Sequence, residues 1–209
     1  MTYSDLGHHH IDFPHALTKL EVGAVLTRGA AAAGVTCLAE FAVTQSSDPT
    51  RERVIDFVWA VRSPGPHLTA EDPHHGQWIV LAAFEIEGHN AQTSSIEKDA
   101  DSLSSAALLG PPECDRWAPT VATILFTVGP DGTEPWSPHG SPITWDRLPT
   151  KAEKNIKRHR RTLEAAVLGM QRRVAIEILL DHELAAQVPA WVERCRDRAK
   201  IMRATVGDG

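Results

Sequence analysis

Two glutamates separated by one residue end a long apolar run, which extends from Gln77 to Gly88. The run has the length and composition of a buried strand. Side chains alternate between the two faces of a strand, so we expect Glu85 and Glu87 to point the same way as Leu81 and Ala83. Two ionised carboxylates on one strand face repel each other. The pair therefore requires raised pKa values, a basic neighbour or a cation, and a divalent metal is one common solution.

A third carboxylate interrupts the preceding apolar run, Arg53 to Val61. Alternation predicts that Asp56 shares a strand face with Val54 and Val58. The opposite face is predicted to be heavily apolar and consists of Ile55, Phe57 and Trp59. A carboxylate in the middle of such a strand must be satisfied by a partner.

These acids need elements that hold them together, and the sequence predicts a helix followed by three strands. A helix from His15 to about Ala33 is expected to close at Gly34. Its apolar spacing points to Leu17, Leu20, Ala24 and Ala31. Strands are expected over 35–44, 53–61 and 77–88, with the first two forming a hairpin. Glu40 adds a further acid from the first of these strands, and Glu21 one from the helix.

A second helix and a fourth strand are expected next. Ser94 and Glu97 have the spacing of a capping box. The apolar face behind it consists of Ile96, Ala100, Leu103 and Ala107, and Lys98 lies on this helix. The run 121–128 is a strand expected to be buried on both faces. A strand, a helix and a strand in this order predict a parallel crossover and an α/β fold.

The chain divides by composition into three parts. Residues 1–14 are expected to form a flexible N-terminus, residues 15–142 an α/β core and residues 143–209 a basic helical segment. Four prolines and three glycines between residues 129 and 142 mark the boundary. Beyond it we expect a helix starting near Thr150, then helix over 176–184 and over 189–204. Basic residues crowd the first of these helices: Lys154, Lys157, Arg158, Arg160 and Arg161.

Charge and composition restrict the function classes. The formal net charge is −6, yet residues 151–209 alone carry 13 Lys and Arg against 8 acids. An acidic body with a basic segment is compatible with gripping a phosphate backbone, although a solvated helix surface is the alternative reading. No apolar run approaches the ~20 residues of a membrane span, so we expect a cytoplasmic protein without membrane contact. Three widely spaced cysteines argue against a disulfide framework.

The order of elements and the acidic motifs resemble the PD-(D/E)XK, or restriction-endonuclease-like, nuclease superfamily. The resemblance covers roughly residues 15–128. It lies in the helix, three strands, helix and strand, and in three short motifs: Ile55-Asp56-Phe57-Val58, Phe84-Glu85-Ile86-Glu87 and Ser95-Ile96-Glu97-Lys98-Asp99. It implies an αβββαβ core with a mixed central sheet.

The resemblance also implies roles for single residues. An Asp on one hairpin strand and an acid on the next bind Mg²⁺ in that superfamily, and a third residue two positions on, usually Lys, positions the attacking water. Asp56 matches the first acid and Glu85 the second. Glu87 stands where the Lys is usual, so it would be a third metal ligand or a base. Lys98 would give electrostatic support, and Glu40 would be an auxiliary carboxylate.

The resulting hypothesis is a nuclease that hydrolyses phosphodiester bonds, with DNA the favoured substrate and Mg²⁺ as cofactor, for which Mn²⁺ can substitute. The basic C-terminal helices would bind nucleic acid, a partner protein or a second subunit in a homodimer or larger complex. The alternative is an inactive module of the same fold that binds nucleic acid or protein. In a purely structural interpretation, Asp56 pairs with Arg53 or Arg62, Glu87 caps the next helix and Lys98 is solvated.

Overall fold

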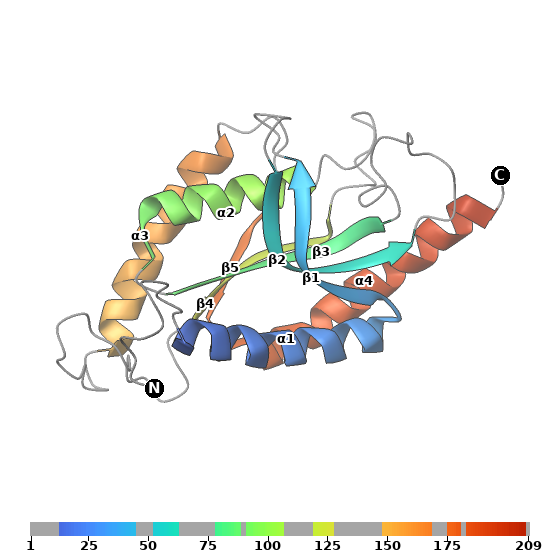
Figure 1. The fold of residues 1–209 in the computed structure, drawn as a ribbon, viewed down its shortest axis with the longest axis horizontal. Helices are drawn as coiled ribbons and strands as arrows, with labels where there is room; N and C mark the ends of the chain where they lie inside the picture. Colours follow the sequence, from blue (N-terminus) through green and yellow to red (C-terminus); the bar gives the residue numbers. More distant parts are fainter. Residues whose placement is uncertain are drawn as a thin grey trace, which may run out of the picture.

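The described residues form a five-stranded mixed sheet between two layers of helices (Figure 1). The computed structural model describes residues 13–44, 52–62, 78–88, 91–106, 119–127, 148–168, 175–180 and 183–207. The expected N-terminal tail, apart from its last two residues, and the expected boundary at 129–142 lie outside this part of the chain. The α/β class predicted from the sequence is confirmed.

The strands follow one another across the sheet in the order β1-β2-β3-β4-β5. β1 (Thr36–Thr44), β2 (Glu52–Arg62) and β3 (Trp78–Gly88) pair antiparallel in succession. β4 (Val121–Thr127) pairs parallel with β3, and β5 (Glu177–Leu180) pairs parallel with β4. The predicted hairpin and the predicted parallel crossover are both confirmed. β4 is buried on both faces from Val121 to Phe126, as expected.

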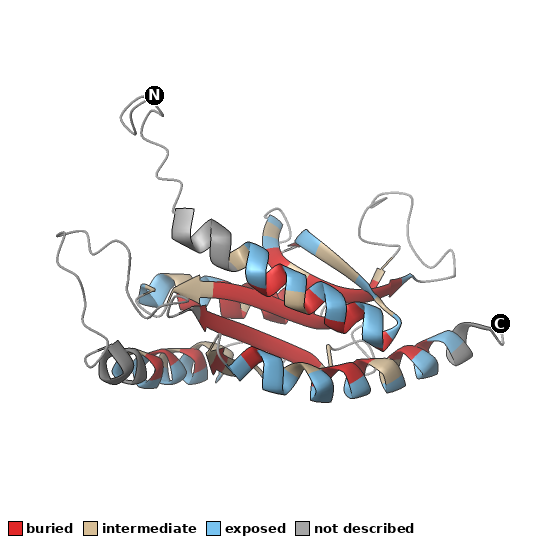
Figure 2. Cartoon of the chain, turned by 90° about the horizontal axis from the view of Figure 1, so that it is seen from below, coloured by how far each residue is buried: buried red, intermediate tan, exposed pale blue. Residues whose placement is uncertain are grey.

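Each face of the sheet is covered by two helices. α1 (Phe13–Ala33) and α4 (Leu184–Gly207) cover one face, where the core includes Leu26, Phe84 and Trp191. α2 (Thr93–Ala106) and α3 (Leu148–Leu168) cover the other, where Ile96 and Phe126 lie in a second core. Figure 2 shows the buried strands enclosed by helices whose outer faces are exposed. None of the described helices is long and apolar enough to cross a membrane.

The helix predicted over 176–184 is wrong, because Glu177–Leu180 forms β5. A four-residue run is too short for periodicity to separate helix from strand. Its conformation is decided by β4, which offers an open edge for parallel pairing. The last helix begins at Leu184, five residues before the predicted start at Pro189, because Leu184 and Val188 pack into the core. The chain beyond residue 147 thus completes the sheet and both helical layers.

The buried face of α1 differs from the one predicted. Leu20 is 71% exposed, and Ala24 and Ala31 are also exposed, whereas Val22 and Leu26 are buried. Two glycines decide this orientation. A Cβ on Gly23 would lie 2.7 Å from the Phe57 ring, and one on Gly29 would lie 2.7 Å from the Trp59 ring. The glycine side of the helix is therefore the side that approaches the sheet. The end of the helix agrees with prediction, since Gly34 follows it with a left-handed φ of 71°.

The side chains of β1 and β2 stop alternating regularly between the two faces of the sheet. The interruption lies at Glu40 in β1 and at Asp56 in β2. Phe57 and Trp59 pack toward α1 and α4, but Ile55 packs toward α2 and α3. The predicted common face of Ile55, Phe57 and Trp59 is therefore wrong. Glu40 has φ of 50°, a left-handed conformation that interrupts the alternation. In Figure 1 both strands bend sharply midway along their length.

A register shift also corrects the face assigned to Leu81. The pairing of β2 with β3 shifts between Trp59 and Ala60, which face Ala82 and Val80. Leu81 is the extra residue, and it packs in the core beside α1 and α4, whereas Ala83 lies in the opposite core. Alternation predicted that Leu81 shares a face with Glu85. That prediction is wrong.

We predict that Gly29→Ala destabilises the protein by about 1–2 kcal/mol, because the new methyl group overpacks against Trp59 and Val188 of α4. The sign is informative, since alanine otherwise favours a helix by about 1 kcal/mol over glycine. Urea unfolding would measure the change. Ala24→Ser, at an exposed position of the same helix, should change the free energy of unfolding by no more than about 0.5 kcal/mol. A stabilised Gly29→Ala variant would contradict the close packing.

Candidate functional site

β2 and β3 separate where their two acids meet. Residue pairing between the strands runs from Arg62–Trp78 to Phe57–Phe84. Beyond that point, side chains take over hydrogen bonds that backbone pairing would otherwise form. The Asp56 amide donates to Glu85 Oε2 at 3.2 Å, and the Ile86 amide donates to Asp56 Oδ2 at 2.8 Å. Asp56 and Glu85 therefore lie side by side at the fork, the point where β2 and β3 separate.

Asp56 forms an ion pair with Lys19 of α1, a residue that the sequence interpretation missed. Lys19 Nζ donates to Asp56 Oδ1, and Asp56 is only 8% exposed. Burial opposes the charge of Lys19, but the hydrogen bond to Asp56 and the nearby charges of Glu40 and Glu85 outweigh it, so the pKa of Lys19 is raised. One signal was available: Lys19 lies three residues before Val22, on the buried side of α1.

The two arginines considered as partners for Asp56 have other contacts. Arg53 Nε lies 3.6 Å from Asp101 Oδ2 of α2, and the Arg62 guanidinium lies 5.7 Å from the centre of the Trp78 ring. Asp56 is thus neutralised from α1, on the opposite side of the sheet from α2.

Glu85 is buried against α2 at 4% exposure. Its burial, and then the charges of Asp99 and Asp56, raise its pKa well above the ordinary value. The hydrogen bonds that Glu85 accepts from the Asp56 amide and from Ser102 act in the opposite direction and do not overcome burial. Ser102 Oγ also lies 3.1 Å from the Lys98 carbonyl oxygen, within hydrogen-bond distance.

Glu87 forms a hydrogen bond with Asp99 of α2, a residue to which the sequence interpretation gave no role. A bond between two carboxyl groups requires a shared proton. Burial, followed by the charge of Glu87, raises the pKa of Asp99 to about 8. Asp99 lies three residues after Ile96 and four before Leu103, both fully buried. That spacing on the apolar face of the helix was the available signal.

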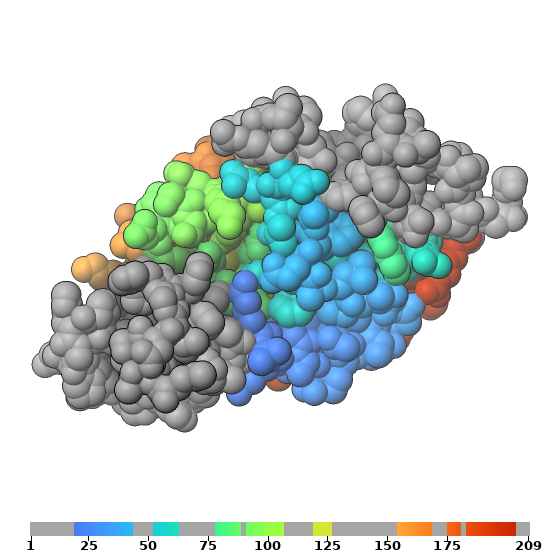
Figure 3. Space-filling view, viewed as in Figure 1, coloured from blue at the N-terminus to red at the C-terminus, as the bar shows by residue number. Residues whose placement is uncertain are grey.

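The other predicted acids and the predicted lysine are exposed. Glu40 is exposed and, by the register of β1 with β2, lies opposite Asp56. Lys98 is exposed on α2, and its charge lowers the pKa of Asp99 without overcoming burial. Glu21 is exposed on α1. Figure 3 shows the surface where β1, β2, α1 and α2 adjoin.

We define the acid cluster as Glu40, Asp56, Glu85, Glu87 and Asp99. Two lysines interact with it, Lys19 from α1 and Lys98 from α2. Burial, and then the charges of neighbouring acids, raise the pKa values of Glu85 and Asp99 within this cluster. Oxygen ligands of this kind suit Mg²⁺ or Mn²⁺. Within the described ranges, no three Asp, Glu, His or Cys side chains are already arranged to hold a metal. Mg²⁺ commonly uses only one or two carboxylates together with water and phosphate, so the residues fit this ion.

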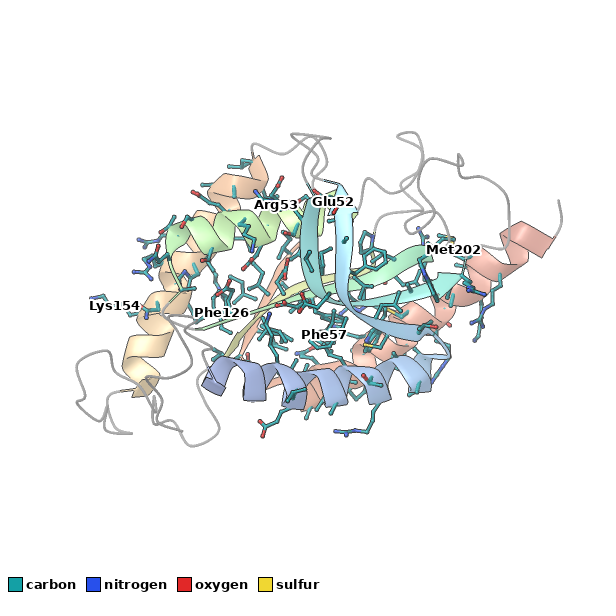
Figure 4. The ribbon with its side chains drawn as sticks, in the orientation of Figure 1. Glu52, Arg53, Phe57, Phe126, Lys154 and Met202 are labelled. Carbon is teal, nitrogen blue, oxygen red and sulfur yellow. The ribbon has the colours of Figure 1, made fainter. Side chains whose placement is uncertain are left out.

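α3 presents the predicted basic residues to solvent. It packs inward through Ile156, Leu163 and His159, and the His159 ring stacks on Phe126 with the ring centres 4.8 Å apart. All five predicted basic residues of this helix are exposed: Lys154, Lys157, Arg158, Arg160 and Arg161. Arg158 donates to the Ala91 carbonyl at 3.3 Å. Figure 4 shows Lys154 pointing away from the body of the molecule.

Basic side chains of α4 are largely tied to other groups. Arg194 pairs with Glu177 of β5, and Lys200 pairs with Asp197 in the same helix. Arg196 donates to the Ala32 carbonyl, and Arg203 to the Gly34 carbonyl, at the end of α1. Electrostatically, α3 is therefore the better placed of the two basic helices to meet an anionic partner.

We predict that the metal-free protein loses stability as pH rises from about 4 to about 8, in part through Asp99. The carboxyl pKa is about 8 when folded, against its ordinary 3.8, so the folded state binds the proton more tightly. The proton on Asp99 stabilises the folded state fully below pH 3.8. This stabilisation falls by up to about 1.4 kcal/mol per pH unit as the pH rises toward 8. Asp99→Asn should lack this component in urea unfolding with a chelator present. Glu97→Gln, exposed on the same helix, should follow the parent, and parallel curves for Asp99→Asn would contradict the assignment.

No protein-family model, no curated protein and no solved structure matches this chain significantly. Neither an activity nor a ligand is therefore transferred from a relative. The chemistry of the site has to be judged from the chain's own carboxylates, lysines and basic helix.

Proposed function

We propose that the protein is a Mg²⁺-dependent nuclease whose reaction centre is the acid cluster at the fork of β2 and β3. The observation that carries the proposal is the excess of buried carboxylates over lysines at that fork. Protons compensate this charge in the absence of a cation, and a divalent cation would compensate it better. DNA is the favoured substrate, as the sequence suggested.

The arrangement of elements supports the proposal. Helix α1, the antiparallel strands β1 to β3, helix α2 and the parallel strand β4 occur in the order that the PD-(D/E)XK resemblance implies. Asp56 and Glu85, which match its two metal-binding acids, lie side by side. Glu87 replaces the usual Lys, but Lys19 of α1 supplies a positive charge beside Asp56. We propose that Lys19 takes the electrostatic role of that residue, with Lys98 contributing from the surface.

Phosphodiester hydrolysis sets clear demands on these residues. Water attacks phosphorus, one phosphorus–oxygen ester bond breaks, the water gives up a proton, and the leaving oxygen gains one. Asp56, Glu85 and Glu87 would hold Mg²⁺, which supplies charge neutralisation and a water of lowered pKa. Glu87 is partly exposed, so it can also accept the proton of the attacking water. Lys19 pairs with Asp56 and orients its carboxylate.

One observation favours the alternative, an inactive binding module of the same architecture. Both oxygens of Asp56 already have protein partners, Lys19 and the Ile86 amide. An acid cluster balanced by lysine and protons needs no metal for stability. In that case the basic side of α3 would be the functional part of the chain, and catalysis would be absent.

We predict that the protein cleaves plasmid or oligonucleotide DNA when Mg²⁺ or Mn²⁺ is present, and that Glu85→Gln lowers the rate by at least about 100-fold. The neutral amide keeps the shape of the side chain but removes the charge that would meet the cation, and such electrostatic losses cost about 10² to 10³ in rate. Glu97→Gln is the matched control. Absence of cleavage by the parent, or equal cleavage by Glu85→Gln, would refute the nuclease and leave the binding module.

We predict that Lys157→Glu combined with Arg161→Glu weakens DNA binding at least 10-fold and lowers the salt dependence of log K by about 2, since each phosphate contact contributes about 0.9 to that slope. Arg194→Glu combined with Lys200→Glu changes the net charge equally on α4 and is the control. Fluorescence anisotropy with a labelled duplex in a salt series would measure both. Equal effects of the two double variants would show a response to net charge rather than a surface on α3.

A further inference from the structure

Glu87 and Asp99 differ from the other two acids of the fork in how their oxygens are satisfied. Asp56 and Glu85 accept hydrogen bonds from backbone amides and contact Lys19 and Ser102 respectively. Asp99 bonds to Glu87, yet its Oδ2 atom is fully buried and has no hydrogen-bond partner among the described residues. Burying an oxygen acceptor without a donor is costly. Asp99 Oδ2 is therefore a buried oxygen of the acid cluster that lacks a hydrogen-bond donor within the described part of the chain.

Asp99 is held in place by the packing of α2. It is 3% exposed, and its neighbours along the buried face are Ile96, Ala100 and Leu103, all fully buried. The carboxyl cannot leave for solvent without unpacking the helix. Glu87, in contrast, is only partly buried and lies near the end of β3, beyond the last residue pair with β2. The pair therefore combines a buried carboxyl group held in place by the helix with a more accessible carboxyl group on the strand.

We infer that Glu87 and Asp99 together bind the divalent cation, which makes Asp99 of α2 a metal ligand outside the set formed by Asp56, Glu85 and Glu87. The inference rests on the metal dependence proposed above. A cation between the two carboxyl groups would satisfy the unpartnered oxygen of Asp99. Two carboxylates, with water and substrate phosphate as further ligands, match the habit of Mg²⁺ and Mn²⁺. Lys98 on the adjacent surface leaves the pair with net negative charge.

The test is Mn²⁺ binding by the full chain at pH 7.5. Binding is measured by isothermal titration calorimetry and by the electron paramagnetic resonance signal of free Mn²⁺. We expect Asp99→Asn to weaken binding at least 10-fold, while Glu97→Gln on the same helix binds as the parent does. The amide can still donate to Glu87, so the variant should fold. Its melting temperature without metal should equal or exceed that of the parent, because a buried acid is removed. A second readout is the Mn²⁺-dependent rise in melting temperature, which follows affinity and should shrink in Asp99→Asn alone.

The outcomes separate this inference from the nuclease proposal. Equal Mn²⁺ binding by the parent and a folded Asp99→Asn would overturn Asp99 as a ligand while leaving the nuclease intact. No Mn²⁺ binding by the parent would overturn both. Mn²⁺ binding that depends on Asp99, in a protein that cleaves no DNA, would support the inference and refute the nuclease. If Asp99→Asn fails to fold, Glu87→Gln gives the same comparison from the accessible side, and unchanged binding there overturns the inference.

Discussion

The carboxylate of Asp56 connects the elements on which the acid cluster depends. It accepts a hydrogen bond from the Ile86 amide of β3 and from Lys19 of α1, while its own amide donates to Glu85. Helix α1, β2 and β3 are thus joined at one residue, at the point where β2 and β3 part. Side chains take the place of backbone pairing there, so the Asp56 and Ile86 amides keep hydrogen-bond acceptors where the strands part.

Concentrating acids at this fork has an energetic cost that the rest of the fold must offset. Burial and mutual repulsion raise the pKa values of Glu85 and Asp99, and a residue in left-handed conformation, Glu40, lies opposite Asp56. Two extensive apolar cores, one on each side of the sheet, supply the stability. Features of this kind concentrate at functional sites, where stability is given up for chemistry. The two basic helices also differ in this respect. Arginines of α4 contact β5 and the end of α1 and so stabilise the fold, whereas the basic residues of α3 mostly face solvent.

Much of the architecture could be predicted because local patterns are strong there. Apolar runs located four of the five strands, and the order of elements predicted the hairpin and the parallel crossover. The failures have physical reasons. β5 is too short to show a period, and its pairing with β4 decides its state. Gly23 and Gly29 add nothing to an apolar pattern, yet they let α1 approach Phe57 and Trp59.

The sequence by itself determined which carboxylates could meet, because Asp56 and Glu85 lie on successive strands and alternation sends Glu85 and Glu87 to one face. Only the tertiary structure decided what surrounds them. Lys19 and Asp99 reach the fork from helices on opposite sides of the sheet, at positions 37 residues before Asp56 and 12 residues after Glu87. Contacts between such distant segments depend on how helices pack and rotate on the sheet. Periodicity along one element carries no information about that rotation relative to another.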